Sequence, residues 1–172
     1  MSDELGHSIT EHKHIYDLFE MINSKLVGTE KKLDIYLIGG GALMFHNAKA
    51  STKDIDVIMA SDLQLELMED VLFRLGFAET PLADEYGNFA LDKMFINGDY
   101  RLDVFNQKVC GKLSISSEMI SRSIVELSLS NVKLHVLSKE DIFVFKSITT
   151  RDGDVEDSAN IIKQGIDWRI VK

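Results

Sequence analysis

The sequence predicts an α/β (α+β) fold, a mixed β-sheet flanked by helices, with further helices at the C-terminus. Short β-branched apolar runs alternate with longer segments of helical periodicity. One pair of runs flanks Asn97-Gly98, a dipeptide typical of a tight antiparallel hairpin turn. The 172 residues suit one domain, which we expect to span 1–172, with a core at about 30–137 and a C-terminal helical part at about 138–172.

The composition is that of an ordinary globular protein and excludes several classes. With 45% hydrophobic and 27% charged residues, the chain is neither disordered nor fibrous. It has no apolar run near the roughly 20 residues that a membrane span needs. The formal net charge of −9 disfavours a broad surface for nucleic acid. Cys110 is the single cysteine and the N-terminus has no signal-peptide core, so we expect a cytoplasmic protein without a membrane partner or an internal disulfide.

The first half of the chain is predicted to contain three helices and two strands. A helix at about Ser8–Leu26 follows from Ile15, Leu18, Phe19 and Ile22, which lie on one helical face. The next elements are a buried strand at 34–38, a turn at Gly39-Gly40-Gly41, a short helix at 42–46, a strand at 54–59 and an amphipathic helix at 63–75 that ends at Gly76.

The second half is predicted to begin with a hairpin of two strands, 88–96 and 100–105. The segment 116–125 fits a helix or a strand, and both interpretations stay open. A strand follows at 132–137. Ser138 stands three residues before Asp141, which predicts a capped helix through about Thr149, and a last helix is expected at about 154–164.

Two acidic residues on a predicted strand are the first candidates for chemistry. Asp54 and Asp56 are two residues apart, so both side chains point to the same face of the sheet. Two carboxylates at that distance repel each other unless a cation lies between them. Mg²⁺ or Mn²⁺, which prefer oxygen ligands, would relieve the repulsion. The alternative is an exposed sheet face with two solvated acids.

Two further features favour a phosphate site beside these acids. Gly39-Gly40-Gly41 closes a buried strand and opens a helix, where backbone N–H groups can bind an anion. A glycine triplet can equally well only reverse the chain. Downstream, Asp103 places a third carboxylate on the second strand of the hairpin, on the same side as Arg101. Three acids beside a glycine turn suit a two-metal phosphoryl-transfer site.

These motifs resemble the DNA polymerase beta-type nucleotidyltransferase superfamily. The resemblance rests on Gly39-Gly40 after a strand, on Thr52 two residues before Asp54, and on Leu102-Asp103-Val104. The sequence is most similar to the branch of minimal nucleotidyltransferases and AbiEii-like toxins of abortive-infection toxin–antitoxin systems. The ending Lys146, Arg151, Asp154, Asp157 resembles the Lys…Arg-x-x-Asp-x-x-Asp end of that branch. The resemblance spans about 34–162.

The resemblance implies a reaction and a role for each motif. Gly39, Gly40 and Gly41, with Thr52, Lys146 and Arg151, would bind an NTP such as ATP. Asp54, Asp56 and Asp103 would hold Mg²⁺ or Mn²⁺, and Asp103 could deprotonate the acceptor hydroxyl. The acceptor would be tRNA, a protein or a small molecule, and a cognate antitoxin or toxin partner is implied for the toxin branch.

Two departures from the superfamily pattern motivate an alternative. Glycine stands where many members have a serine, and Lys49 stands in a stretch where an arginine is common. The alternative is a catalytically weak nucleotide-binding or toxin–antitoxin partner protein on the same fold. The spacing of Lys146, Arg151, Asp154 and Asp157 also fits a salt-bridged surface helix.

Overall fold

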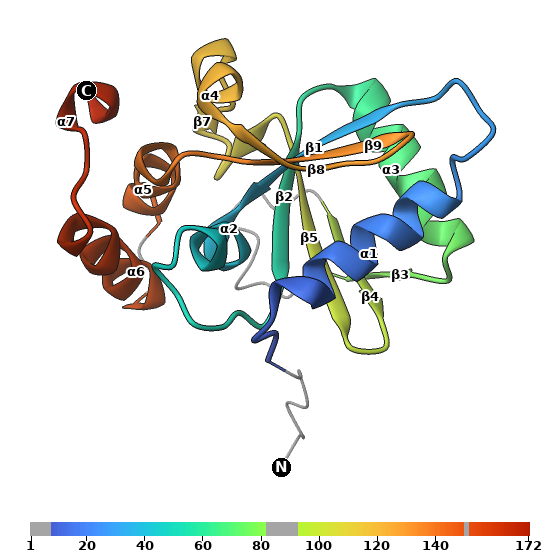
Figure 1. Ribbon diagram of the computed structural model, residues 1–172, viewed down its shortest axis with the longest axis horizontal. Coiled ribbons are helices and arrows are strands. Elements are labelled where there is room, and N and C mark those ends of the chain that lie inside the picture. Colours follow the sequence, from blue (N-terminus) through green and yellow to red (C-terminus); the bar gives the residue numbers. More distant parts are fainter. Residues whose placement is uncertain (1–7, 82–92, 150–151) are drawn as a thin grey trace.

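The computed structural model describes residues 8–81, 93–149 and 152–172 and contains a mixed sheet flanked by helices (Figure 1). Seven strands form this sheet in the order β3-β4-β5-β2-β1-β9-β8, and β6 and β7 form a separate two-stranded sheet. The predicted fold class is therefore confirmed. In chain order the elements are α1 (His12–Ser24), β1 (Leu33–Ile38), α2 (Gly39–Phe45), β2 (Ile55–Met59), α3 (Asp62–Arg74), β3 (Ala78–Thr80), β4 (Lys93–Asn97), β5 (Tyr100–Asn106), β6 (Lys108–Val109), β7 (Leu113–Ser114), α4 (Ser117–Arg122), β8 (Ile124–Ser128), β9 (Val132–Val136), α5 (Lys139–Ser147), α6 (Asp152–Lys163) and α7 (Trp168–Val171).

Strand direction in the middle of the sheet determines where the site forms. β1 runs antiparallel to β2, so the end of β1 meets the beginning of β2. β5 runs parallel to β2 and therefore begins at the same edge. The register places Ile38 beside Asp56, and Asp56 beside Asp103. Residues that are far apart in the sequence thus meet at one edge of the sheet.

The first helix has the predicted buried face but begins later than predicted. The four apolar residues predicted to share one face, Ile15, Leu18, Phe19 and Ile22, are all buried. The helix starts at His12 because the preceding segment is extended: Ile9 donates a backbone hydrogen bond to Thr52 at 2.7 Å and accepts one from it at 3.0 Å. Ser8 and Thr10 therefore lie outside the helix.

The hairpin is confirmed for the described residues, but its turn is one residue later than predicted. Asn97 pairs with Tyr100, so the two-residue loop is Gly98-Asp99, with Gly98 at a φ of 56°. The Asn97 side-chain amide donates to the Leu75 carbonyl at 3.0 Å. This bond anchors Asn97 to the end of α3 and keeps it in the strand. Residues 88–92 of the predicted first strand lie outside the described residues.

The segment 116–125, for which helix and strand both stayed open, contains both. Ser116 caps α4 by accepting a hydrogen bond from the Met119 amide, and β8 begins two residues after the helix ends. β8 is an edge strand whose register shifts between Val125 and Leu127. Most of its residues are exposed, so it lacks the alternation that identifies a half-buried strand.

Helices α5, α6 and α7 lie together on the side of the sheet where α2 is found (Figure 1). Ser138 caps α5 as predicted, because its hydroxyl accepts from the Asp141 amide at 3.1 Å. α6 begins at Asp152, two residues before the predicted start. The short α7 was not predicted; its Trp168 packs edge-on against Phe143 of α5 at a centroid distance of 5.8 Å.

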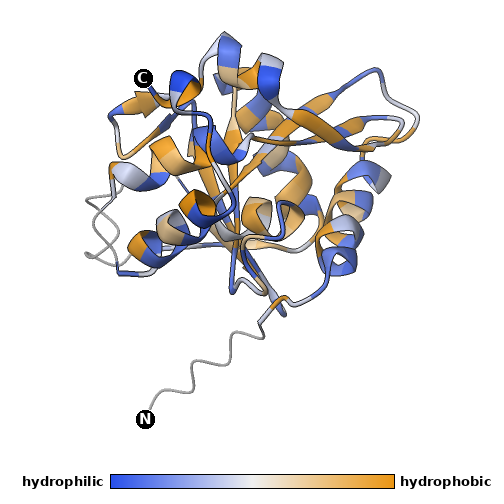
Figure 2. Cartoon of the chain, turned by 60° about the vertical axis from the view of Figure 1, so that its left-hand side comes forward, coloured by the Kyte–Doolittle hydropathy of each residue, from blue (hydrophilic) through white to orange (hydrophobic). Residues whose placement is uncertain are grey.

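Apolar residues, coloured orange in Figure 2, are concentrated along the central strands and recur on the helices around them. The buried apolar residues of these elements form one core cluster.

Replacing Leu18, whose side chain is 0% exposed, with Ala should lower the free energy of unfolding by about 2–5 kcal/mol, because it leaves a cavity in this core. Urea unfolding followed by circular dichroism measures the change. Leu63→Ala is the control: its leucine is 76% exposed, and a change within about 0.5 kcal/mol is expected. Equal losses in both variants would show that the assigned core is wrong.

Candidate active site

Three carboxylates converge at the edge where β2 and β5 begin. Asp54 directly precedes β2, Asp56 lies within it, and Asp103 lies on β5 beside Asp56. One ligand oxygen of each lies within 4.8 Å of the other two. Asp103 is 5% exposed, while Asp54 and Asp56 are half-buried. The sequence-predicted acids are therefore brought together in space, and they are called the carboxylate triad below.

Glycine is required where α2 begins beside the triad. Gly39 has a φ of +64°, and a Cβ there would lie 2.3 Å from an oxygen of Asp56. A Cβ on Gly40 would lie 2.7 Å from the Thr52 hydroxyl. The predicted glycine turn is in fact the first turn of α2, packed against the triad and Thr52. A Cβ on Gly41 would point away from the triad, toward Leu37 and Ile15 in the core.

Thr52 shapes the loop that leads into the triad. Its hydroxyl donates to the Asp54 carbonyl at 2.9 Å, and its backbone pairs with Ile9. The loop from α2 to β2 is therefore fixed by one hydrogen bond within the loop and by backbone pairing with the N-terminal segment. Thr52 lies close enough to Gly40 to exclude any larger residue there.

A largely buried ion-pair network connects the C-terminal helices with this loop. Lys146 of α5 donates to Asp154 and contacts Asp157, both on α6 and both at 2.8 Å. Lys49, from the α2–β2 loop, donates to the same Asp157 oxygen at 2.9 Å. Burial alone would lower the pKa of the Lys146 ammonium group, but its hydrogen bonds to Asp154 and Asp157 outweigh burial and raise the pKa above its usual value. Lys146 is therefore charged at neutral pH.

The network and two acids of the triad, Asp54 and Asp56, face one hollow of about 220 Å³. It is lined by Gly40, Lys49, Thr52, Asp54, Asp56, Lys146, Gly153, Asp154 and Asp157. Lys146, Asp154 and Asp157 are thus part of a buried cluster beside the triad, in contrast to the surface-helix alternative. Arg151, the remaining predicted site residue, lies outside the described residues.

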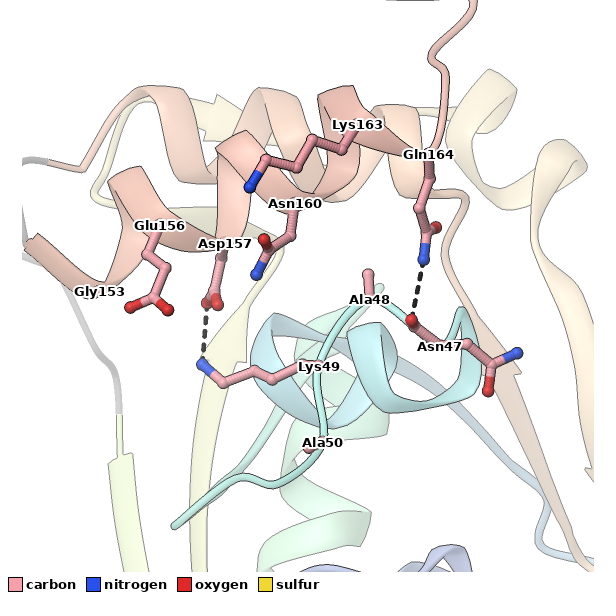
Figure 3. A pocket seen from close by; sticks show the side chains of 10 residues that line it. All are labelled: Asn47, Ala48, Lys49, Ala50, Gly153, Glu156, Asp157, Asn160, Lys163 and Gln164. Carbon is pink, nitrogen blue, oxygen red and sulfur yellow. Dashed lines mark hydrogen bonds and ion pairs between the residues drawn. The ribbon is translucent and has the colours of Figure 1, made fainter.

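A larger hollow of about 740 Å³ lies between α6 and the segment that follows α2 (Figure 3). It shares Lys49, Gly153 and Asp157 with the smaller hollow. Figure 3 shows the Lys49 side chain pointing to Asp157, with Asn160 and Lys163 further along α6. Gln164 closes the far end by donating to the Asn47 carbonyl at 2.8 Å. The two hollows therefore adjoin at Lys49, Gly153 and Asp157.

Arg101 joins the triad, although sequence reasoning gave it no role. Its Nε and Nη2 atoms donate to the two oxygens of Asp103 at 3.3 and 3.2 Å, and Nε lies 3.8 Å from an Asp54 oxygen. The available signal was the Arg-x-Asp spacing on a strand, which places both side chains on one face. Lys49 is a different case, because nothing local in the sequence indicates a contact with Asp157.

The donor set fits a divalent cation that prefers oxygen. Three carboxylate oxygens within 4.8 Å of one another are suitable ligands for Mg²⁺ or Mn²⁺. The triad would hold the ion, and the basic side chains of Lys49 and Lys146 line the same hollow as Asp54 and Asp56. Within the described residues, no helix is both long and apolar enough to cross a bilayer.

Two solved structures share the fold of this chain. The crystal structure of ANT(2'')-Ia in complex with adenylyl-2''-tobramycin has a TM-score of 0.56 and 13% sequence identity, over 92% of this chain and 91% of that chain. The solution structure of the antibiotic-resistance factor ANT(2'')-Ia has a TM-score of 0.58 and 14% identity, over 94% and 89% of the two chains. At these identities the similarity shows the fold. None of the curated proteins matches this sequence.

The family comparison covers nearly the whole chain. Residues 13–172 match the family described as "Nucleotidyltransferase of unknown function (DUF6036)". The match includes the glycine start of α2, the triad and the C-terminal helices. The chain therefore belongs to the DUF6036 nucleotidyltransferases, enzymes of the transferase class.

Proposed function

We propose that the protein transfers a nucleoside monophosphate from an NTP to an acceptor hydroxyl, with release of pyrophosphate, at the edge where the triad lies. The observation that carries this proposal is the convergence of Asp54, Asp56 and Asp103 within 4.8 Å beside the glycine start of α2. Their carboxylates would hold Mg²⁺ or Mn²⁺. A bound divalent ion offsets the charge that develops on the attacking and leaving oxygens of an in-line displacement.

The other walls of the small hollow supply the groups that bind a triphosphate. Backbone N–H groups at Gly39 and Gly40 approach the phosphates without a side chain in the way. Lys49 and Lys146 place two ammonium groups on the lining of the same hollow, both paired with Asp157. Lys49 thereby takes the place of the arginine that is common in this stretch, as a point charge rather than a planar fork.

Asp103 is the group proposed to accept the proton of the attacking hydroxyl. It is the most buried carboxylate of the triad, and it lies beside Asp56 across the β2–β5 pairing. A base must lie within hydrogen-bond reach of the proton it removes, so the acceptor hydroxyl would enter from the β5 side. ATP is the proposed donor, since one of the fold neighbours was solved with adenylyl-2''-tobramycin.

The acceptor we favour is a small hydroxylated molecule that carries positive charge. The net charge of −9 attracts cations and opposes a polyanion such as tRNA. tRNA or protein acceptors, and a role among AbiEii-like toxins with a cognate antitoxin, remain proposals of the sequence resemblance. The second candidate function is a nucleotide-binding or toxin–antitoxin partner protein with weak catalysis, favoured by the glycine at the position of the usual serine.

Asp56→Asn should lower nucleotidyl transfer by at least about 100-fold, because it removes one charge and one ligand from the triad. Transfer is measured with α-labelled NTPs and a panel of aminated and hydroxylated acceptors. Glu66→Gln, on the exposed face of α3, is the control and should transfer at the wild-type rate. Full activity in Asp56→Asn would falsify the proposed mechanism. Metal-dependent NTP binding without any product in the wild type would favour the weakly catalytic alternative.

Gly39→Ala should abolish NTP binding and lower the free energy of unfolding by more than Gly28→Ala does. Both glycines have positive φ, at +64° and +84°, and each substitution should cost about 1–2 kcal/mol of backbone strain. Only at Gly39 does the added Cβ also collide with Asp56; at Gly28 it meets nothing within 4 Å. Calorimetric NTP titration with Mg²⁺ and urea unfolding test this pair. Retained binding in Gly39→Ala would contradict the assigned contact.

Lys146→Met should weaken NTP binding and lower the free energy of unfolding by about 3 kcal/mol, because it leaves buried carboxylates on α6 without one of their cations. The control is Lys13→Met, which removes an exposed pair with Asp17 and should leave both properties unchanged. Chemical unfolding and calorimetry on the same samples provide the measurements. The role of Lys146 would be refuted if the two variants behaved alike.

A further inference from the structure

The Arg101 side chain contacts the triad and lies on the same face of the sheet as the three carboxylates. It lies two residues before Asp103 on β5, so both side chains extend to the same side of the sheet. Both oxygens of Asp103 accept hydrogen bonds from its guanidinium, at 3.3 and 3.2 Å, and Nε is 3.8 Å from Asp54. One arginine therefore bridges two of the three carboxylates.

This arrangement differs from that of a residue that merely orients a metal ligand. An orienting partner binds one ligand on the side away from the ion. Arg101 instead spans Asp54 and Asp103 and engages both oxygens of the latter, the paired geometry in which a guanidinium binds a carboxylate. A bridging cation between two carboxylates offsets their repulsion, which is also the electrostatic effect of a divalent ion.

Partial burial strengthens the ion pair between Arg101 and Asp103. The side chains of Arg101 and Asp103 are 29% and 7% exposed, so water screens their attraction only in part. Arginine keeps its proton at any ordinary pH, so its charge is permanent. A divalent ion at the triad would use the same Asp103 oxygens, so the ion and the Arg101 guanidinium would compete for them.

We propose that Arg101 is a built-in counter-ion of the triad that competes with the divalent ion for Asp103, so that metal loading requires the guanidinium to withdraw from this carboxylate. The inference rests on the proposed function, since it takes the triad to be the metal site. Its consequence is a protein that tolerates three clustered carboxylates at low metal concentration, at the expense of metal affinity.

Mn²⁺ binding to the full chain tests the proposal without any enzymatic assay. The electron paramagnetic resonance signal of free Mn²⁺ gives the dissociation constant for the wild type, Arg101→Met and Arg101→Lys. Removing the competing charge should tighten binding by about tenfold. The dissociation constant of Arg101→Lys should lie between those of the wild type and Arg101→Met, because lysine keeps the charge and loses the paired hydrogen bonds.

The matched control is Arg122→Met. Arg122 makes the same kind of paired contact with Asp141, at 3.2 and 2.7 Å, on helices outside the triad. This variant should bind Mn²⁺ like the wild type. In the double variant Asp56→Asn/Arg101→Met the tight binding should disappear, which assigns it to the triad.

Two failures can be told apart. Equal or weaker binding in Arg101→Met overturns the competition and makes Arg101 an orienting partner, while the proposed function stands. Absence of Mn²⁺ binding in both the wild type and Arg101→Met overturns the metal site itself, and the competition with it.

If Arg101→Met does not fold, nitrogen-15 resonances of arginine side chains in the wild type provide the same test. The Arg101 Nε–H signal, assigned by its loss in Arg101→Lys, should shift as Mg²⁺ is added, because its hydrogen bond to Asp103 is broken. An unchanged signal at saturating Mg²⁺ would overturn the proposal.

Discussion

Mutual repulsion among three carboxylates is the constraint on which the site depends. The core supplies the rigidity that holds them together, because the register of β1, β2 and β5 places Asp56 beside both Ile38 and Asp103. Such clustering is favourable only where opposite charge or a bound cation compensates it. Arg101 compensates it within the sheet, and glycine at the start of α2 leaves the approach to the acids clear.

Helices α5 and α6 line the same hollow as Asp54 and Asp56. Asp157 on α6 is shared by Lys146 of α5 and Lys49 of the α2–β2 loop, so one carboxylate joins three segments. Lys146, Asp154 and Asp157 are buried, whereas the Lys49 side chain is 32% exposed. Loss of one of the three buried groups therefore leaves a charge poorly compensated and poorly solvated. The position of α6 and the placement of the two ammonium groups are therefore coupled.

The acids, the hairpin and most helices could be predicted because each depends on local spacing. Asp54 and Asp56 alternate with apolar residues, and Ser138 precedes Asp141 at a capping distance. What could not be predicted depends on distant partners. The contact of Lys49 with Asp157 joins residues 108 positions apart, the pairing of Ile9 with Thr52 delays α1, and the Asn97 amide moves the hairpin turn. The roles assigned to the three acids, the glycines, Thr52 and Lys146 stay predictions.

The pairing of Ile9 with Thr52 has a practical consequence for anyone who handles this protein. Two backbone hydrogen bonds attach the first described residues to the loop that carries Asp54, and Ser8 lines a hollow of about 370 Å³ with Lys49 and Asp54. A purification tag on the N-terminal side of Ser8 would therefore be attached to a segment that lies beside the candidate site. The C-terminus lies beyond α7, away from the N-terminal segment in Figure 1, and is the better place for a tag or an immobilising linker.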